Sequence, residues 1–356
     1  MDNFHADTNN SCITSGKIDV SPSTNEKKRI RKLYNGVGGA MLAQYFLMYI
    51  IVLVCYILFS GSITEEYNEG TGAAVVGFTE AAIMFCSPAA ASIIMFFVYN
   101  GICHADIKSF LSTDKVNGMY ILGAVLVAFF FHQIGMILEY GLAIVLTVVG
   151  YDTPELNIEL MNDLPTTVID IFSSVILAPI GEELFFRGVV LRQTSRVSQR
   201  FGIFFSAFIF GIMHGNPYQF ILASLLGLVL GYIAVDSNSL IPPIICHMAV
   251  NLMASVSDIA AYFDEALYEP VFYICSLIEL VVGIVGFIYI KRNVGIKLPS
   301  YTEYHKKRTM PIMITSALVV IMVVIYSYDL ITSIEPIDVT NADYTEAMKY
   351  LICNLH

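Results

Sequence analysis

The stretch of sequence that decides the fold is residues 166–192, TTVIDIFSSVILAPIGEELFFRGVVLR. It is long and apolar enough to cross a bilayer as a helix. Yet it carries Glu182, Glu183 and Arg187 close together near its end. Charged side chains at membrane depth are unfavourable, with values from about 2.5 to above about 10 kcal/mol each, unless they are paired or solvated. The stretch therefore predicts a transmembrane helix that contributes charged groups to a functional site.

The spacing of these three residues divides their roles. On a helix, Glu183 and Arg187 are i,i+4 neighbours with the acid first, which is the favourable order for an ion pair. Glu182 is rotated by about 100° from Glu183 and has no local partner, so it is the better candidate for a general base. The alternative is structural: a Glu–Arg clamp that holds two helices together, with Glu182 merely hydrated.

The composition of the chain predicts an integral membrane protein. Of its 356 residues, 56% are hydrophobic and 14% are charged, which is typical of a polytopic helical membrane protein. Unbroken apolar runs argue against an outer-membrane barrel, whose strands alternate. The net charge of −11 argues against nucleic-acid binding. The seven cysteines form no CxxC pair, which supports neither a disulfide framework nor a cysteine zinc site.

Outward from the central stretch, the apolar runs predict an all-α bundle of about eight or nine transmembrane spans around a buried polar active site. The third run is longer than one crossing needs, which predicts a tilted, broken or partly external helix. The fifth is short enough to be a half-helix buried among its neighbours. The candidate spans are 36–59, 75–99, 118–149, 166–192, 201–215, 218–235, 240–257, 271–290 and 311–333.

The flanks of this bundle complete the domain organisation. Residues 1–32 are expected to be a disordered polar tail that ends in a basic cluster, and residues 335–356 an acidic tail, with the transmembrane domain at 33–334. The first apolar run is too long and begins too late for a cleavable signal peptide. Lys and Arg gather in alternate loops, so the positive-inside rule predicts a cytoplasmic N-terminus.

Two further apolar runs each carry a histidine. His214 ends one run, just before Gly215-Asn216-Pro217, which predicts the end of a helix. His247 and Asn251 are i,i+4 neighbours on another and can aim two donors at one point, as an oxyanion hole requires. Each histidine taken alone could equally be a satisfied packing residue.

The remaining buried polar residues are isolated on their runs, and we expect them to form hydrogen bonds between helices or to line a cavity. They are Glu80, His132, Gln133, Glu139 and Glu279. The small-residue stretches Gly36–Ala40 and Ala89–Ser92 are expected to be close-packing surfaces.

Together, the polar residues suit hydrolysis of a peptide bond within a membrane. Glu182 as base, assisted by His214, would activate water, and His247 and Asn251 would stabilise the oxyanion. Alternatively, Glu182, His214 and His247 could hold Zn²⁺ with a metal-bound water as nucleophile. The local zincin pattern H-E-x-x-H does not match these spacings, so the zinc alternative depends only on side-chain types.

Three motifs in order, Glu182-Glu183-x-x-x-Arg187, Phe210-x-x-x-His214 and His247-x-x-x-Asn251, resemble the CPBP family. This is the CAAX-protease and bacteriocin-processing family, also called type II CAAX prenyl endopeptidases or the Abi family. The resemblance covers about residues 130–260, the expected protease core.

This resemblance implies an intramembrane endopeptidase with catalytic Glu182. It implies that His214 helps to activate water, that His247 and Asn251 bind the oxyanion, and that Glu183 and Arg187 support the site. Members are often named metalloproteases, while a metal-independent glutamate mechanism is also held for the family. We favour the mechanism without a cofactor and keep Zn²⁺ as the alternative.

The resemblance also sets the expected partners and location. The substrate would be a membrane-associated or lipidated peptide or protein, with the lipid bilayer as the other partner and no nucleic acid. The absence of a targeting signal and the loose family fit suggest a bacterial plasma membrane. Helix lengths place Glu182 and His247 in the cytoplasmic half of the bilayer. The same count places His214 about 10 Å deeper than a site shared with these two residues requires. Two other classes stay open: an inactive scaffold or regulator of the bacteriocin-immunity type, and, less favoured, a transporter.

Overall fold

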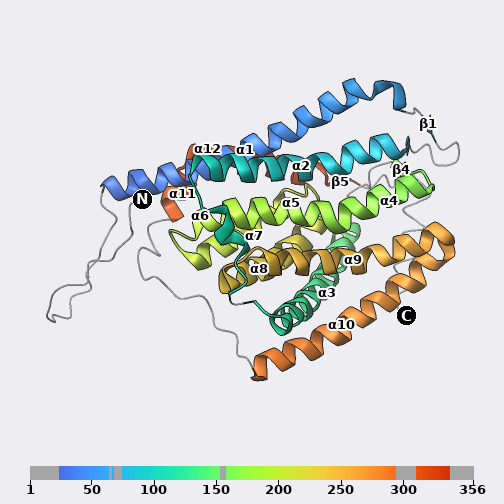
Figure 1. Ribbon diagram of the computed structural model, residues 1–356. Helices are drawn as coiled ribbons and strands as arrows, with labels where there is room; N and C mark the ends of the chain where they lie inside the picture. The colour runs from blue at the N-terminus through green and yellow to red at the C-terminus, as the bar shows by residue number, and fades with distance from the viewer. Residues whose placement is uncertain are drawn as a thin grey trace.

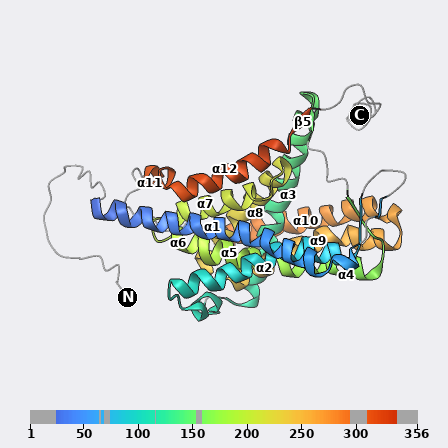
Figure 2. The same cartoon turned by 90° about the horizontal axis from the view of Figure 1, so that it is seen from above.

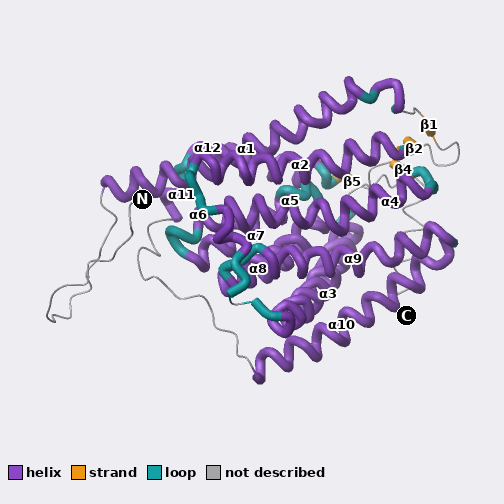
Figure 3. Tube along the Cα trace, in the orientation of Figure 1, coloured by secondary structure: helices purple, strands orange, loops and turns teal. Residues whose placement is uncertain are grey.

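The computed structural model describes residues 24–63, 66–67, 74–114, 116–152, 158–293 and 310–336. Helices dominate these residues (Figures 1 and 3), which confirms the all-α bundle. Seven helical stretches are long and apolar enough to cross a membrane, and two shorter apolar helices, α7 and α12, accompany them. The helices are α1 (Thr24–Leu58), α2 (Phe78–Ile102), α3 (Gly118–Val148), α4 (Leu164–Phe172), α5 (Ala178–Phe185), α6 (Arg192–Thr194), α7 (Gln199–Ile212), α8 (Pro217–Ser237), α9 (Ile241–Phe263), α10 (Tyr268–Asn293), α11 (Met310–Ile314) and α12 (Ala317–Thr332).

The N-terminal boundary differs from the expected one. Helix α1 begins at Thr24, so the basic cluster 27–32 forms its early turns instead of the end of a disordered tail. The physical reason is that Lys and Arg are good helix formers and an apolar helix follows directly. Residues 1–23 and 337–356 lie outside the described residues, and Glu335–Pro336 forms strand β5.

The helix starts follow the capping signals in the sequence. Asp163 accepts a hydrogen bond from the backbone nitrogen of Thr166 at 2.7 Å, ahead of Pro165 in the first turn of α4. Asn216 caps α8 in the same way, with Pro217 as its first residue. These caps satisfy backbone donors that no earlier turn can reach. Gly215 has a φ of +64°, a conformation that glycine adopts without strain, and it completes the turn between α7 and α8.

The decisive stretch forms one helical crossing, Leu164–Thr194, but it is not regular. Two π-helical segments, Ser173–Leu177 and Phe186–Leu191, flank the short helix α5, which carries Glu182 and Glu183. A π-helical turn inserts a residue and occurs frequently at functional sites. The two segments therefore set the direction in which the charged residues point.

Close backbone approach fixes this crossing against α2. A Cβ atom on Gly181 would lie 2.8 Å from the carbonyl oxygen and 2.9 Å from the Cα atom of Ala89. Similarly, a Cβ on Gly38 would lie 2.6 Å from the backbone of Val319 in α12. Both small-residue stretches are thus close-packing surfaces, as the sequence predicts.

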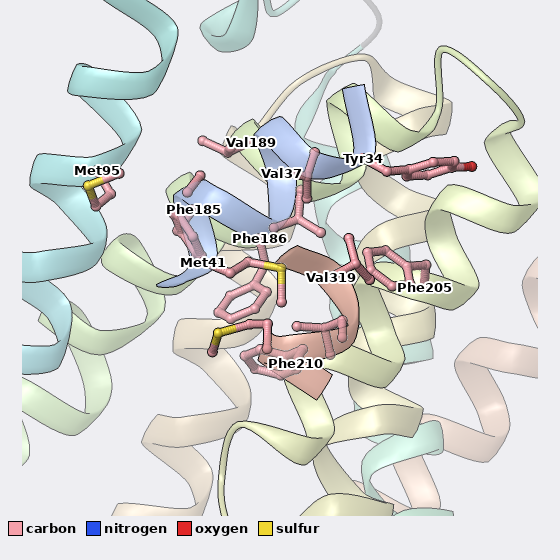
Figure 4. Packing of buried hydrophobic residues seen from close by; sticks show 14 of the residues in the cluster. Tyr34, Val37, Met41, Met95, Phe185, Phe186, Val189, Phe205, Phe210 and Val319 are labelled. Atoms are coloured by element: carbon pink, nitrogen blue, oxygen red, sulfur yellow. The ribbon is translucent and has the colours of Figure 1, made fainter. Parts of the chain in front are cut away.

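The main hydrophobic core surrounds the second half of the crossing. Phe186 and Val189 are fully buried between residues of α1, α2, α7 and α12 (Figure 4). A second cluster, which includes Ala128, Leu230 and Cys246, joins α3, α8 and α9. The second half of the crossing is therefore enclosed by packed helices.

Helix α3 explains the long third run. It is an unbroken helix of 31 residues and runs steeply across the direction of α1 and α2 (Figure 2). Short strands join the connections at one end of the bundle: β2 (Ala74–Val76) pairs antiparallel with β1 (Glu66–Tyr67) and parallel with β4 (Ile158–Leu160). A second pair, β3 (Tyr151–Asp152) with β5 (Glu335–Pro336), is antiparallel. The α1–α2 and α3–α4 connections thus lie at the same end.

Candidate active site

The centre of the candidate site is the carboxylate of Glu183, which is fully buried. Its Oε1 atom lies 2.8 Å from Nη1 of Arg187 and 3.0 Å from Nδ1 of His247. The predicted i,i+4 ion pair is therefore present, and it is extended by a histidine from α9. The carboxylate of Glu183 is therefore an anchor for two side chains, and loss of Arg187 would leave its buried charge unpaired.

Arg187 connects this anchor to two more helices. Its Nη2 atom donates a hydrogen bond of 3.3 Å to the carbonyl oxygen of Gly227 in α8. Its guanidinium carbon lies 4.6 Å from the centre of the Phe210 ring in α7, a cation–π distance. Arg187 itself is 2% exposed. The clamp that the sequence left as the structural alternative therefore exists, formed by Glu183 and Arg187 without Glu182.

Glu182 lies in a different environment from Glu183. Its side chain is 19% exposed, whereas that of Glu183 is 0% exposed. Oε2 of Glu182 lies 3.8 Å from Nε2 of His247, and Glu182 also interacts electrostatically with Arg187. This distance is longer than a hydrogen bond. Glu182 is thus the more accessible of the two glutamates.

The contact of His247 with Glu183 defines which ring nitrogen carries a hydrogen. A carboxylate oxygen only accepts, so Nδ1 of His247 carries the hydrogen in its contact with Glu183. In the neutral ring, Nε2 is then an acceptor, and in the protonated ring it is a donor. His247 is therefore held by one glutamate and presents its other nitrogen toward the second.

His214 reaches the same region from the end of α7. Its Nδ1 atom donates to the carbonyl oxygen of Phe210 at 2.8 Å, which leaves Nε2 as an acceptor in the neutral ring. The Phe210 ring lies edge-to-face with both histidines, at centroid distances of 5.1 Å to His214 and 5.8 Å to His247. Phe210 of the second motif thus separates and orients the two imidazoles. Helix α7 has 14 residues and is about 21 Å long, which is too short to cross the bilayer. His214, which follows its end, is therefore half-buried within the bundle.

Asn251 has a partner that the sequence did not indicate. Its Nδ2 atom donates a hydrogen bond of 2.7 Å to the carbonyl oxygen of Ser174, within the first π-helical segment. Widened turns leave backbone acceptors that a side chain can satisfy. Asn251 therefore fastens α9 to the crossing, and the structure engages Asn251 and His247 with different groups rather than at one shared point. Because Nδ2 bears two hydrogens, one remains for another acceptor.

The zinc alternative requires Glu182, His214 and His247 to converge. Among the described residues, no group of three or more His, Cys, Asp or Glu side chains is arranged to hold a metal ion. Nδ1 of each histidine contacts a protein oxygen, which leaves Nε2 as the nitrogen that a metal would bind. Glu182, His214 and His247 are thus not grouped as a metal site among the described residues; Zn²⁺ stays the alternative to the metal-free chemistry derived below.

The isolated polar residues on other helices follow the structural expectation. Oε2 of Glu279 in α10 accepts hydrogen bonds from His132 at 2.9 Å and Gln133 at 2.5 Å, both in α3. This confirms the predicted contact between helices for three of the five residues. Glu139 interacts electrostatically with His132, and Glu80 is buried in α2.

These observations define an integral membrane protein of packed apolar helices with a Glu–Arg–His cluster in its interior. Residues 164–253 match a family model described as type II CAAX prenyl endopeptidase Rce1-like. This segment is about a quarter of the chain, contains all the motif residues and lies within the expected core of 130–260. The match confirms the resemblance to the CAAX-protease family, a family of membrane peptidases. No curated protein and no solved structure matches the chain.

Proposed function

We propose that the chain is an intramembrane endopeptidase that hydrolyses a peptide bond of a membrane-associated or lipidated peptide or protein. The observation that carries this proposal is the unequal environment of the two adjacent glutamates. Glu183 is sealed and paired with Arg187, whereas Glu182 is partly exposed and faces Nε2 of His247. The family match supports the same class of reaction.

In the proposed reaction, Glu182 is the general base. It takes a proton from a water molecule, and the water oxygen attacks the carbonyl carbon of the substrate. The carbon–nitrogen bond then breaks, and the proton held by Glu182 passes to the leaving amine nitrogen. His214, whose Nε2 is an acceptor, is suited to orient the attacking water by accepting its second hydrogen.

The developing negative charge on the carbonyl oxygen needs donors. His247 supplies Nε2–H when its ring is protonated, and the carboxylate of Glu183 at Nδ1 stabilises that cationic form. Asn251 contributes the Nδ2 hydrogen that is not used for Ser174. Glu183 and Arg187 act as positioning residues, since they hold His247 and do not face the substrate.

The first test is cleavage of a library of apolar and lipidated peptides by the purified full chain in detergent. Glu182→Gln and a strong chelator form two further arms. We expect cleavage by the natural chain, loss with Glu182→Gln and retention under the chelator. Loss in both arms would favour the zinc alternative. Absence of cleavage by the folded natural chain would favour the scaffold.

We also infer that the N-terminus and the opening of the site face the cytoplasm. Two observations support this orientation. The acidic α1–α2 and α3–α4 connections meet through β2 and β4, and the basic Arg192 contacts the α2–α3 connection at Ser109. Labelling of a Glu182→Cys variant in oriented vesicles tests the opening. Reaction only from the outer side would overturn it.

A further inference from the structure

A polar cavity lies beyond the candidate active site, at the end of the crossing where α6, α7 and the α8–α9 connection meet. Its volume is about 120 Å³, and since one water needs only about 10–15 Å³, the cavity has room for a phosphate group. Among the described residues that line it, none is acidic. The polar ones are Arg187, Arg192, Ser195, Gln199, Asn238 and Ser239.

The second π-helical segment brings the two guanidinium groups to this cavity. Arg187 and Arg192 are five residues apart across Phe186–Leu191. In a regular α-helix such residues point in different directions, whereas hydrogen bonds from i to i+5 bring them toward one side. The second π-helical segment therefore places two guanidinium groups at this cavity, of which that of Arg187 is paired with Glu183.

Arg192 is held in place by the α2–α3 connection. Its Nη2 atom donates a hydrogen bond of 3.0 Å to Oγ of Ser109, and its guanidinium carbon lies 3.8 Å from the centre of the Phe110 ring. Asp106 interacts with it electrostatically from the same connection. A fixed guanidinium on an aromatic wall is a preorganised binding group for an oxyanion.

Two further donors have no recorded partner. The Nε atom of Arg187 and the Oγ atom of Ser195 are buried and, among the described residues, form no hydrogen bond. Buried donors without partners are unfavourable by about 1–3 kcal/mol each. Both residues line the cavity, so these donors lie next to it, together with the charge of Arg192, while Glu183 pairs with Arg187.

We propose that this cavity binds a phosphate-type oxyanion, supplied by the headgroup of an anionic lipid or by free phosphate. Its position supports this chemistry: it lies at the end of the crossing Leu164–Thr194 and at the junction of α8 and α9, all of which are long enough to span the bilayer. Basic pockets between membrane helices at that depth bind lipid phosphates. The proposal does not depend on peptide hydrolysis, because neither Glu182 nor His247 lines the cavity.

The test is the binding of short-chain phosphatidylglycerol to the purified full chain in neutral detergent. Short-chain phosphatidylcholine is the lipid control, and inorganic phosphate is a separate arm. Bound lipid is counted by native mass spectrometry, and phosphate binding is followed by thermal unfolding, with the reactivity of buried Cys246 as the signal. Arg192→Gln is the test variant. Arg196→Gln is the matched control, since it removes the same charge from an exposed neighbour that does not line the cavity.

We expect phosphatidylglycerol to bind more tightly than phosphatidylcholine, and Arg192→Gln to weaken its binding by about tenfold or more while Arg196→Gln does not. Equal binding by inorganic phosphate would identify free phosphate as the source, and binding of the lipid alone would identify the headgroup. Ser195→Ala provides a milder variant in case Arg192→Gln does not fold. Equal loss in both arginine variants, or no binding of either probe, would overturn the proposal. Glu182→Gln should bind normally, which separates this site from the catalytic one.

Discussion

The Nδ1 atom of His247 lies 3.0 Å from Oε1 of Glu183, although the two residues are 64 positions apart in sequence. The contact joins α9 to the crossing that carries the paired glutamates. The second glutamate of the motif therefore holds the histidine, and in the proposed mechanism the first glutamate activates water. Buried carboxylate–histidine pairs of this kind fix both the orientation and the tautomer of the ring.

We expect substitution of Glu183 to lower stability and substitution of Glu182 to lower activity. Glu183→Gln leaves the buried guanidinium of Arg187 without its counter-charge, so we expect a loss of about 3–5 kcal/mol in the free energy of unfolding. Glu182→Gln should leave this free energy nearly unchanged and lower cleavage by about 10²–10⁴-fold. Unfolding in rising amounts of a denaturing detergent, followed by the reactivity of Cys246, measures the first effect. Equal stability of the two variants would contradict the division of roles.

Asn251 should act partly through the π-helical segment. Asn251→Ala removes the hydrogen bond to the carbonyl oxygen of Ser174, and we expect unfolding to become easier by about 1 kcal/mol. Asn251→Asp should be worse, because an ionised carboxylate cannot donate to a carbonyl.

Kinetics distinguish this positioning role from binding of the oxyanion. If Asn251 also donates to the developing negative charge, Asn251→Ala lowers kcat more than it raises KM. A change in stability with an unchanged kcat would limit Asn251 to fastening α9.

The sequence predicted most of this architecture because its signals are local. Apolar run length gives the crossings, and the i,i+4 spacing gives the Glu183–Arg187 pair. The two π-helical segments could not be predicted, since no residue type marks an i→i+5 turn. The partner of Asn251 depends on the first of these segments, so it was hidden for the same reason.

Contacts between helices that are distant in sequence could not be predicted either. That Glu279 meets His132 and Gln133 follows from how α3 crosses α10, a relationship that a single sequence does not encode visibly. For the same reason, the spacing of the motifs did not predict that Nδ1 of His247 would contact Glu183.

The cluster between α3 and α10 should be structural. Glu279→Ala leaves His132 and Gln133 without their acceptor in a buried site, so we expect a loss of about 1–3 kcal/mol in unfolding free energy with unchanged cleavage. Glu279→Gln keeps an acceptor oxygen and should lose less. Loss of cleavage at normal stability would instead indicate a functional role for this cluster, as a transporter or a proton pathway requires.

The close contact between Gly181 and Ala89 should position Glu182. Gly181→Ala inserts a Cβ at 2.8 Å from the carbonyl oxygen of Ala89, so α5 must move away from α2, and we expect both stability and cleavage to fall. Gly101→Ala is the matched control, because a Cβ there meets nothing within 4 Å and alanine favours the helix by about 0.5–1 kcal/mol. Ala89→Gly removes one of the three clashing atoms, so combining it with Gly181→Ala should restore only part of the activity. Full activity of Gly181→Ala alone would mean that the site tolerates displacement of the helix that carries its base.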